Sequence, residues 1–571
     1  MSDLKTVLIN DARIEDISGD ISFSVQGGAQ QNTFQPQMAN TSSNTSHSWQ
    51  INVPSENIVV DRRLLIDTDV VFVINVTNVP ANEFAMDWGV DIGFGPYPLN
   101  SCYLTQNALI NNCGLTVNTQ DIMAPLLRMN DQMIHTHYDG WTPSMVDDTF
   151  YYYSAAVGAS NNPLSGVKNG PMNNKIRGRG CHPIEVLSVV HTIAATGAVN
   201  ALLQSTAPED TFVITIKTHL TEPILFLSPF ISNPTVANEA GFLGINNMTF
   251  NFTIDNALKR VFRTAKNYTY TFGFGNVAGN NSGWSNLRIL MNYLSVQPSQ
   301  YAKISARNIL PLLQYDRYIT NNGNNQLLIA DTEVKYSSSN IALNQIPDSL
   351  IIFGRVPMSQ QSSKNSDSFF TIKSISVNFN NVSGLLASCT PQELWLLSQK
   401  AGSSQAYNEF SGYNYAAGNN TGEWVPSTGS LLVLQPAFCF NLPDYLSSSS
   451  LGSYNLQFDL TLYNQSNDNI TPEIVVISVT SGYMSIHQGS AQSFSGVLNK
   501  EMVMNAKDGA AVPRLSQSDY ERLVGGTMNN RGVANLTKML KNRRGPQISV
   551  ESGGAISGGV MSGGKLGKYL R

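Results

Sequence analysis

The sequence predicts an all-β protein made of two related domains, and three observations support that prediction. Apolar and polar residues alternate with a period of two along much of the chain, as in strands with one buried face. Patterns typical of long helices are scarce. Landmarks of the first half return in the same order in the second half, and 571 residues exceed what a single core accommodates.

The alternating pattern is clearest in three segments. In Met248–Ile254 and Tyr454–Leu462, large apolar side chains alternate mainly with Asn, Gln, Asp and Thr. In Tyr268–Phe274, aromatic side chains alternate with Thr and Gly. Each segment predicts a strand that buries one face against a core.

The repeated landmarks begin with a short helix. Asn118–Leu127 returns as Thr390–Leu397, where Thr390 is expected to N-cap a helix and Glu393 to close a capping box. An apolar strand and an alternating strand then follow in both halves: Leu225–Phe230 and Met248–Ile254 in the first, Leu432–Phe438 and Tyr454–Leu462 in the second. The first copy holds roughly 60 extra residues between helix and strand. We interpret this order as a duplicated β domain.

Composition and landmarks together predict four regions. These are a polar N-terminal arm over 1–55, a first domain over 56–298 with an insertion around 129–222, a second domain over 299–495, and a Gly-, Ser- and basic-rich tail over 496–571.

Charge is sparse and unevenly distributed. Charged residues make up 13% of the chain, so its polar surface consists mainly of Asn, Ser, Thr and Gln, which suits a protein packed against its own copies. The net charge is −5, with +7 in residues 496–571 and −12 before them. The acidic balance of the residues before 496 argues against DNA binding there, so we expect any DNA contact only in the tail. There, an amphipathic stretch at Leu536–Arg543 fits a solvated or scaffold-binding helix better than a nucleic-acid contact.

Neither secretion nor a membrane span is expected. Residues 1–11 lack the apolar core of a signal peptide. The most apolar stretch, Val186–Leu203, contains His191 and Asn200 and is too polar to cross a bilayer. The cysteines are scattered without a CxxC pair, as expected for buried apolar residues in a reducing compartment: Cys102, Cys113, Cys181, Cys389 and Cys439.

Residues that could support catalysis or metal binding do not form a convincing set. His135 and His137 would share one face of a strand, but no third ligand lies at a suitable spacing, so polar packing is the better interpretation. Asp147 and Asp148 are adjacent and would diverge on a strand, which makes them a poor acid–base pair. We therefore expect no enzymatic activity, metal or cofactor.

Three segments of the first half carry a family resemblance: Pro54–Arg63, the run from Trp141 to Gly178, and Thr221–Phe230. They resemble, in that order, the opening stretch, a long loop and a strand of the first jelly roll in the major capsid proteins of virophages and polinton-like viruses, within the tailless-phage and adenovirus lineage. Ile176 departs from the proline expected before Arg177, which affects only the detail of the loop.

This resemblance implies two tandem eight-stranded jelly rolls and a homotrimer that forms a pseudo-hexameric capsomer of an icosahedral shell around DNA. The implied partners are further copies of the chain, penton proteins and minor or cement capsid proteins, with assembly inside the host cell and residence in the virion. The insertion would form a tower, with aromatic side chains as candidate trimer contacts: Trp141, Phe150, Tyr151, Tyr152 and Tyr153.

The resemblance also points to processing of the tail. Relatives often rely on a maturation cysteine protease that cuts after Gly-Gly preceded, two residues back, by Met, Ile or Leu. Three Gly-Gly pairs in the tail fit, with Gly526, Gly559 and Gly564 as the residues before the cut. A flexible linker that remains as an inner strap is the alternative.

Two other functions use similar folds. A carbohydrate-binding spike or lectin-like module would explain neither the ordered duplication nor the basic tail. A jelly-roll enzyme of the cupin or glycosidase type would need clustered histidines or paired carboxylates, and the sequence shows neither. The sequence therefore predicts a non-enzymatic capsid subunit.

Overall fold

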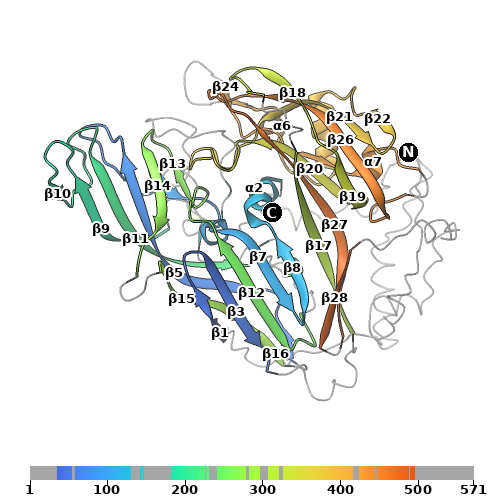
Figure 1. Ribbon diagram of the computed structural model, residues 1–571, viewed down its shortest axis with the longest axis horizontal. Helices are drawn as coiled ribbons and strands as arrows, with labels where there is room; N and C mark the ends of the chain where they lie inside the picture. Colours follow the sequence, from blue (N-terminus) through green and yellow to red (C-terminus); the bar gives the residue numbers. More distant parts are fainter. Residues whose placement is uncertain are drawn as a thin grey trace, which may run out of the picture. The chain divides into compact units, whose positions relative to one another are not determined.

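The computed structural model describes residues 35–54, 58–129, 142–144, 146, 182–225, 227–230, 241–277, 282–295, 307–320, 326–415, 424–443, 446–487 and 489–495. Strands dominate these residues, and each half of the chain forms two main sheets (Figure 1).

The first half is a jelly roll. One sheet contains, in spatial order, β1 (Gln35–Met38), β15 (Trp284–Met291), β5 (Leu65–Thr77) and β11 (Thr211–Pro223). The other contains β3 (Ser46–Asn52), β12 (Asn247–Ile254), β7 (Tyr103–Ile110) and β8 (Cys113–Val117). Counted along the chain, these eight strands take the orders 1-8-3-6 and 2-7-4-5, the arrangement of a jelly roll.

The second half repeats this topology. Its 1-8-3-6 sheet contains β17 (Arg307–Thr320), β27 (Glu473–His487), β20 (Ser349–Arg355) and β25 (Leu432–Leu434). In its 2-7-4-5 sheet, β18 (Glu333–Ser337) and β19 (Ile341–Gln345) both pair with β26 (Leu451–Tyr463), followed by β21 (Thr371–Phe379) and β22 (Val382–Leu385). The predicted double jelly roll is confirmed.

Shorter elements extend or connect these sheets. The strands are β2 (Thr41–Ser42), β4 (Ile58–Val60), β6 (Ile92–Phe94), β9 (Glu185–Thr192), β10 (Val199–Asn200), β13 (Phe262–Thr264), β14 (Thr269–Phe274), β16 (Tyr293–Ser295), β23 (Tyr413–Tyr415), β24 (Trp424–Pro426) and β28 (Ser490–Ser495). The helices are α1 (Pro98–Ser101), α2 (Thr119–Met129), α5 (Pro391–Lys400), α6 (Tyr407–Phe410) and α7 (Pro436–Cys439).

The short helix after the fifth strand forms in both halves, as α2 and α5. Thr390 is the N-cap of α5, and the Thr390 side chain accepts a hydrogen bond from the backbone N–H of Glu393. The Glu393 carboxylate in turn accepts from the backbone N–H of Thr390 at 2.7 Å, which completes the predicted capping box.

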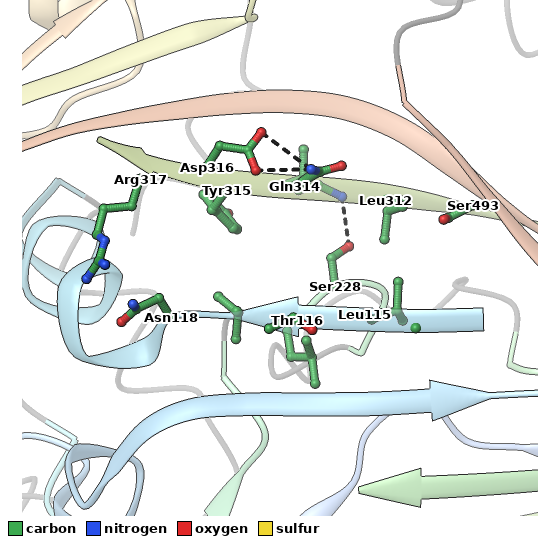
Figure 2. Close-up of a pocket in the computed structure, with 14 residues that line it drawn as sticks. Leu115, Thr116, Asn118, Ser228, Leu312, Gln314, Tyr315, Asp316, Arg317 and Ser493 are labelled. Carbon is green, nitrogen blue, oxygen red and sulfur yellow. Dashed lines mark hydrogen bonds between the residues drawn. The ribbon is translucent and has the colours of Figure 1, made fainter. Parts of the chain in front are cut away.

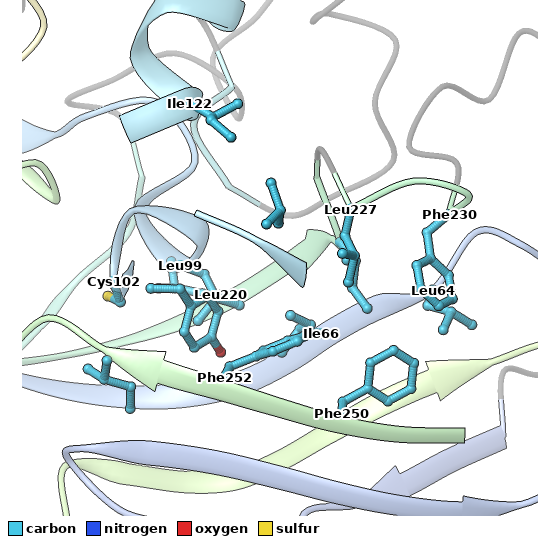
Figure 3. Packing of buried hydrophobic residues seen from close by; sticks show 14 of the residues in the cluster. Leu64, Ile66, Leu99, Cys102, Ile122, Leu220, Leu227, Phe230, Phe250 and Phe252 are labelled. Carbon is cyan, nitrogen blue, oxygen red and sulfur yellow. The ribbon is translucent and has the colours of Figure 1, made fainter. Parts of the chain in front are cut away.

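Strands β20 and β25 in the 1-8-3-6 sheet of the second half are buried on both faces. Leu350 and Ile352 of β20 pack between the two sheets of their own jelly roll. The alternate residues Ile351 and Phe353 pack instead into the core cluster of the first jelly roll, part of which Figure 3 shows. The two halves therefore share apolar packing, and β20 reads as a continuous apolar run because neither face meets water.

Two expectations about the first half are wrong. None of the residues that the structure describes in Leu225–Phe230 lies in a strand, because β11 ends at Pro223 and lies beside β5, as β25 lies beside β20. The expected arm over 1–55 also contains β1, β2 and β3, which belong to the sheets. Its polar composition hid an alternation in β3, where His47, Trp49 and Ile51 are buried while their neighbours carry the polar face. The expected boundary at 298/299 lies outside the described residues and stays a prediction.

Candidate assembly surfaces

Buried ion pairs join α2 of the first jelly roll to the second. The Asp121 carboxylate, 1% exposed, accepts hydrogen bonds from Arg317 of β17 and Arg355 of β20. Arg355 also donates to Glu473 of β27 at 2.8 Å. Near the other end of the helix, the Nε atom of Arg128 lies 3.3 Å from a carboxylate oxygen of Glu409. One helix thus supplies charges of both signs to its neighbour.

A second ionic contact joins the halves at Asp367. Arg260 donates to its carboxylate from Nε at 3.0 Å, and Arg263 also donates to it. Burial acts to raise the pKa of Asp367, but the two guanidinium groups hold it at about 2. These charged side chains are largely buried. Removing one of them would leave the remaining charges buried without a partner, which is strongly destabilising.

The outward face of the first 1-8-3-6 sheet carries exposed apolar side chains, here called the valine face: Val190, Val199 and Val213 on β9, β10 and β11. Val190 and Val213 are direct cross-strand partners and are 39% and 37% exposed. On the opposite side of the sheet, His191 and Phe212 are buried and stacked. Exposed apolar groups gathered on one sheet face are typical of an interaction surface.

Further along the same outward face lies a charged cluster. His219 of β11 faces two carboxylates, with Nδ1 2.8 Å from Asp69 and Nε2 3.1 Å from Asp67. Hydrogen bonding to Asp67, followed by Asp69, raises the pKa of His219. Burial acts to raise the pKa of Asp67, but hydrogen bonds from His219, Thr221 and Arg288 hold it at about 2. The outward face therefore combines an apolar region with a fixed pattern of charge.

A pocket of about 410 Å³ lies between β8 of the first jelly roll and β17 of the second. Figure 2 shows their side chains on either side of it, and the Ser228 hydroxyl oxygen accepts a hydrogen bond from the backbone N–H of Leu313 at 2.9 Å. The Gln314 amide donates to the Asp316 carboxylate at 3.1 Å on the same side of the pocket. Ser493 of β28 also lines it.

Several predicted residues lie outside the described part of the chain. These are the aromatic trimer contacts Trp141, Phe150, Tyr151, Tyr152 and Tyr153, the processing positions Gly526, Gly559 and Gly564, and His135, His137, Asp147 and Asp148. Within the described ranges, no three or more His, Cys, Asp or Glu side chains are grouped to hold a metal, and no helix is long and apolar enough to cross a membrane.

Sequence reasoning missed Asp121 and Asp367 altogether. Each is a single carboxylate in its own segment, and its arginine partners lie between 104 and 234 residues away in the chain. The only local signal was the position of Asp121 in the predicted short helix, and that signal does not indicate a partner in the other domain.

Comparisons with known proteins agree with this architecture. Residues 2–294 match the family model described as the Sputnik virophage major capsid protein first domain, and residues 315–482 match the major capsid protein V20 C-terminal domain. The chain is 25% identical over 545 residues to the putative capsid protein V20 of Sputnik virophage, covering 92% of this chain and 84% of that protein.

Two solved structures share the fold. The chain in the cryo-EM structure of the Sputnik virophage is 21% identical, with a TM-score of 0.69 over 92% of this chain and all of that one. The crystal structure of the mavirus major capsid protein is 14% identical, with a TM-score of 0.63 over 88% and 98% of the respective chains. The first-domain family model alone covers just over half of this chain. The resemblance predicted from the sequence is therefore confirmed. This chain belongs to the Sputnik-type virophage major capsid protein family and is a structural component of the virion.

Proposed function

We propose that this major capsid protein forms a homotrimer that serves as a pseudo-hexameric capsomer of an icosahedral shell around a DNA genome. The observation that carries the proposal is the repeated topology, since one chain holds two jelly rolls with the same strand order. Three such chains bring together six similar domains, and a ring of them presents six similar edges to a hexagonal lattice.

The packing of the 1-8-3-6 sheets supports a head-to-tail ring. In the second jelly roll, the outward side of this sheet is covered by the first jelly roll of the same chain, through residues such as Ile351 and Phe353. In the first jelly roll, the equivalent outward side carries the exposed valine face. Covering that face with the second jelly roll of the next copy would repeat the contact within the chain, and a repeated contact of this kind can close a ring.

Sedimentation of the purified full-length protein tests the trimer. The expected species has three times the chain mass of 62.2 kDa, and it persists at micromolar concentration because obligate interfaces commonly bury more than roughly 2,000 Å². A stable, well-folded monomer at that concentration would contradict the proposal. Within the trimer, we assign additional subunit contacts to Trp141, Phe150, Tyr151, Tyr152 and Tyr153 of the insertion.

We further propose that a viral maturation cysteine protease trims the tail after Gly526, Gly559 or Gly564. A cut after Gly526 removes eight Lys or Arg residues and one Glu, which leaves a body with a net charge of −12. Loss of the basic segment would reduce attraction between the shell and acidic partners, including DNA. The intact mass of chains from mature particles should correspond to one of these ends, whereas a chain still ending at Arg571 would contradict the proposal.

The remaining roles are structural. We infer that the protein acts without catalysis or a cofactor and meets penton and minor or cement proteins in the shell, with any DNA contact confined to the tail. Elemental analysis of the purified protein tests the first part. A stoichiometric transition metal that is lost when His135 and His137 are replaced would contradict it.

A further inference from the structure

The helix that follows the fifth strand carries the same charges in both jelly rolls. Counted from the first residue of each helix, the third residue is acidic, Asp121 in α2 and Glu393 in α5. The tenth residue is basic, Arg128 in α2 and Lys400 in α5. The two positions lie seven residues apart, which is about two turns, so the acid and the base share one face of each helix.

In α2 this charged face is covered within the chain. The Asp121 carboxylate binds Arg317 of β17 and Arg355 of β20. Arg128 pairs with Glu409, which also belongs to the second jelly roll. Asp121 and Arg128 are both buried. The charged face of α2 is therefore a contact surface between two successive jelly rolls.

In α5 the equivalent face is open. Glu393, Leu396 and Lys400 are exposed, and their spacing places them on one side of the helix. Among the described residues, the hydrogen bonds of Glu393 stay within the capping box that it forms with Thr390. α5 therefore presents its acid and base to solvent, whereas α2 presents the same charges to the next jelly roll.

We propose that the charged face of α5 docks on the first jelly roll of the next copy, with Glu393 against Lys217 and His219 of β11. This assignment rests on the head-to-tail ring proposed above, in which the contact within the chain is repeated between copies. The partner is therefore a second copy of this chain. The contacted surface is the outward side of its first 1-8-3-6 sheet, beside the valine face.

The register of the second sheet shows where the acid of α2 lies on it. Arg355 is on the outward side of β20 and lies opposite Glu473, the first residue of β27. Because Arg355 binds Asp121, the acid of the helix lies over the third strand of the sheet, level with the start of the eighth.

The same level can be located in the first sheet. There the first residue of the eighth strand, β15, lies opposite Val70 of β5. Val70 points into the core, so the nearest outward positions on β5 are Asp69 and Val71. Their cross-strand partners on β11 are His219 and Lys217. A helix docked as α2 is docked would therefore bring its acid close to these two side chains.

The accessible groups at this level suit an acid. Lys217 is 39% exposed and His219 is 46% exposed, whereas Asp69 is 21% exposed and Asp67 only 5%. An approaching carboxylate would meet the nitrogen atoms of Lys217 and His219 before it met the two carboxylates. Electrostatic complementarity of this kind fixes the orientation of one subunit on another.

Sedimentation of charge variants tests the assignment, with dissociation of the trimer followed over a dilution series in a urea concentration too low to unfold the chain. Glu393→Arg should raise the concentration at which the trimer dissociates at least about tenfold, because like charges would then oppose each other at every contact. Lys217→Glu should have a similar effect. Combining the two should restore at least half of the loss on a logarithmic scale, because the charges are then exchanged between the partners.

Two further variants separate this contact from folding. Glu393→Gln keeps a side-chain oxygen for the capping box and removes the charge, so it should weaken the trimer, though less than Glu393→Arg, without lowering the unfolding free energy. Glu333→Arg on β18 is the matched control. Glu333 is also exposed, and it lies at the edge of its sheet farthest from β22, the strand that precedes α5. This variant should leave dissociation of the trimer unchanged.

A carbodiimide, which joins a carboxylate to an amine in direct contact, provides a second measurement on the unchanged protein. In trimers mixed from normal and heavy-isotope chains, a cross-linked peptide should join Glu393 of one copy to Lys217 of another. Cross-links confined to single chains, or equal dissociation of Glu393→Arg and Glu333→Arg, would overturn the assignment and leave the trimer standing. An unchanged protein that sediments as a monomer would instead contradict the trimer itself, and this assignment with it.

Discussion

The same sheet has different surroundings in the two jelly rolls. In the second, strands β20 and β25 of the 1-8-3-6 sheet are buried on both faces, because the first jelly roll covers the side that turns away from the local core. In the first, the equivalent sheet buries one side and presents the valine face and the His219 cluster on the other. An apolar outward face recurs in both copies, and only one of them is covered within the chain. The difference indicates where the next subunit belongs.

The largest expected effect on stability comes from removing an ion pair between the two jelly rolls. Asp121→Ala would leave the buried Arg355 without one of its two carboxylate partners and would remove the carboxylate that pairs with the partly exposed Arg317, and it should lower the free energy of unfolding by about 3–5 kcal/mol. Urea unfolding measures this loss. Glu209→Ala, at an exposed position, serves as the control and should change stability by less than about 0.5 kcal/mol. A comparable small change for Asp121→Ala would mean that the junction does not hold the halves together.

A pair of neighbouring residues on β20 tests whether both faces are equally buried. Ile351 points toward the first jelly roll and Ile352 toward the second, and both are 0% exposed. Replacing either with alanine should cost about 2–5 kcal/mol of unfolding free energy. In a second jelly roll that stood apart from the first, Ile351 would face water, so a cost near zero for Ile351→Ala alone would contradict the shared core.

Substitution on the valine face should affect assembly more than folding. Val213→Asp places a charge at an exposed position, and we expect a loss of stability of no more than about 1 kcal/mol. Burying that charge between subunits costs far more free energy than leaving it exposed on the monomer. The variant trimer should therefore dissociate at a concentration at least about tenfold higher than the concentration at which the unchanged trimer dissociates. Val382→Asp, on the half-exposed β22, is the control. Equal sedimentation of both variants as trimers would place the subunit contact elsewhere.

The smallest effect concerns the pH dependence of the His219 cluster. The folded pKa of His219 lies above its ordinary value of 6.5, so its stabilisation is fully present below pH 6.5 and is lost as pH rises through the folded pKa. Because His219 is partly exposed, the contribution should be below about 1 kcal/mol. Thermal unfolding at pH 6 and pH 9 should differ less for His219→Gln than for the unchanged protein. An identical difference would show that the cluster does not contribute.

How far the sequence predicted the molecule depended on what each segment faces. β12 and β26 lie with one side toward a core, so their alternation appeared directly in the residues. The capping box at Thr390 was equally readable, because every partner lies within four residues. β20 has no polar face, and its continuous apolar run gave no sign that a second domain covers it.

The candidate assembly surfaces were less predictable. Asp121 gains its role from arginines far away in the chain, and no local pattern records that distance. Val190 and Val213 form a surface only because β9 and β11 pair in a particular register. A register is fixed by tertiary packing, so the sequence contained the apolar residues without indicating which face they would share.

Cryo-electron microscopy of the purified protein tests most directly whether the two jelly rolls of one chain form a third of a capsomer. The account predicts particles with threefold symmetry and a six-lobed outline, in which the valine face of each chain contacts the second jelly roll of the next. Single double-lobed particles, or trimers whose valine faces are exposed to solvent, would contradict it.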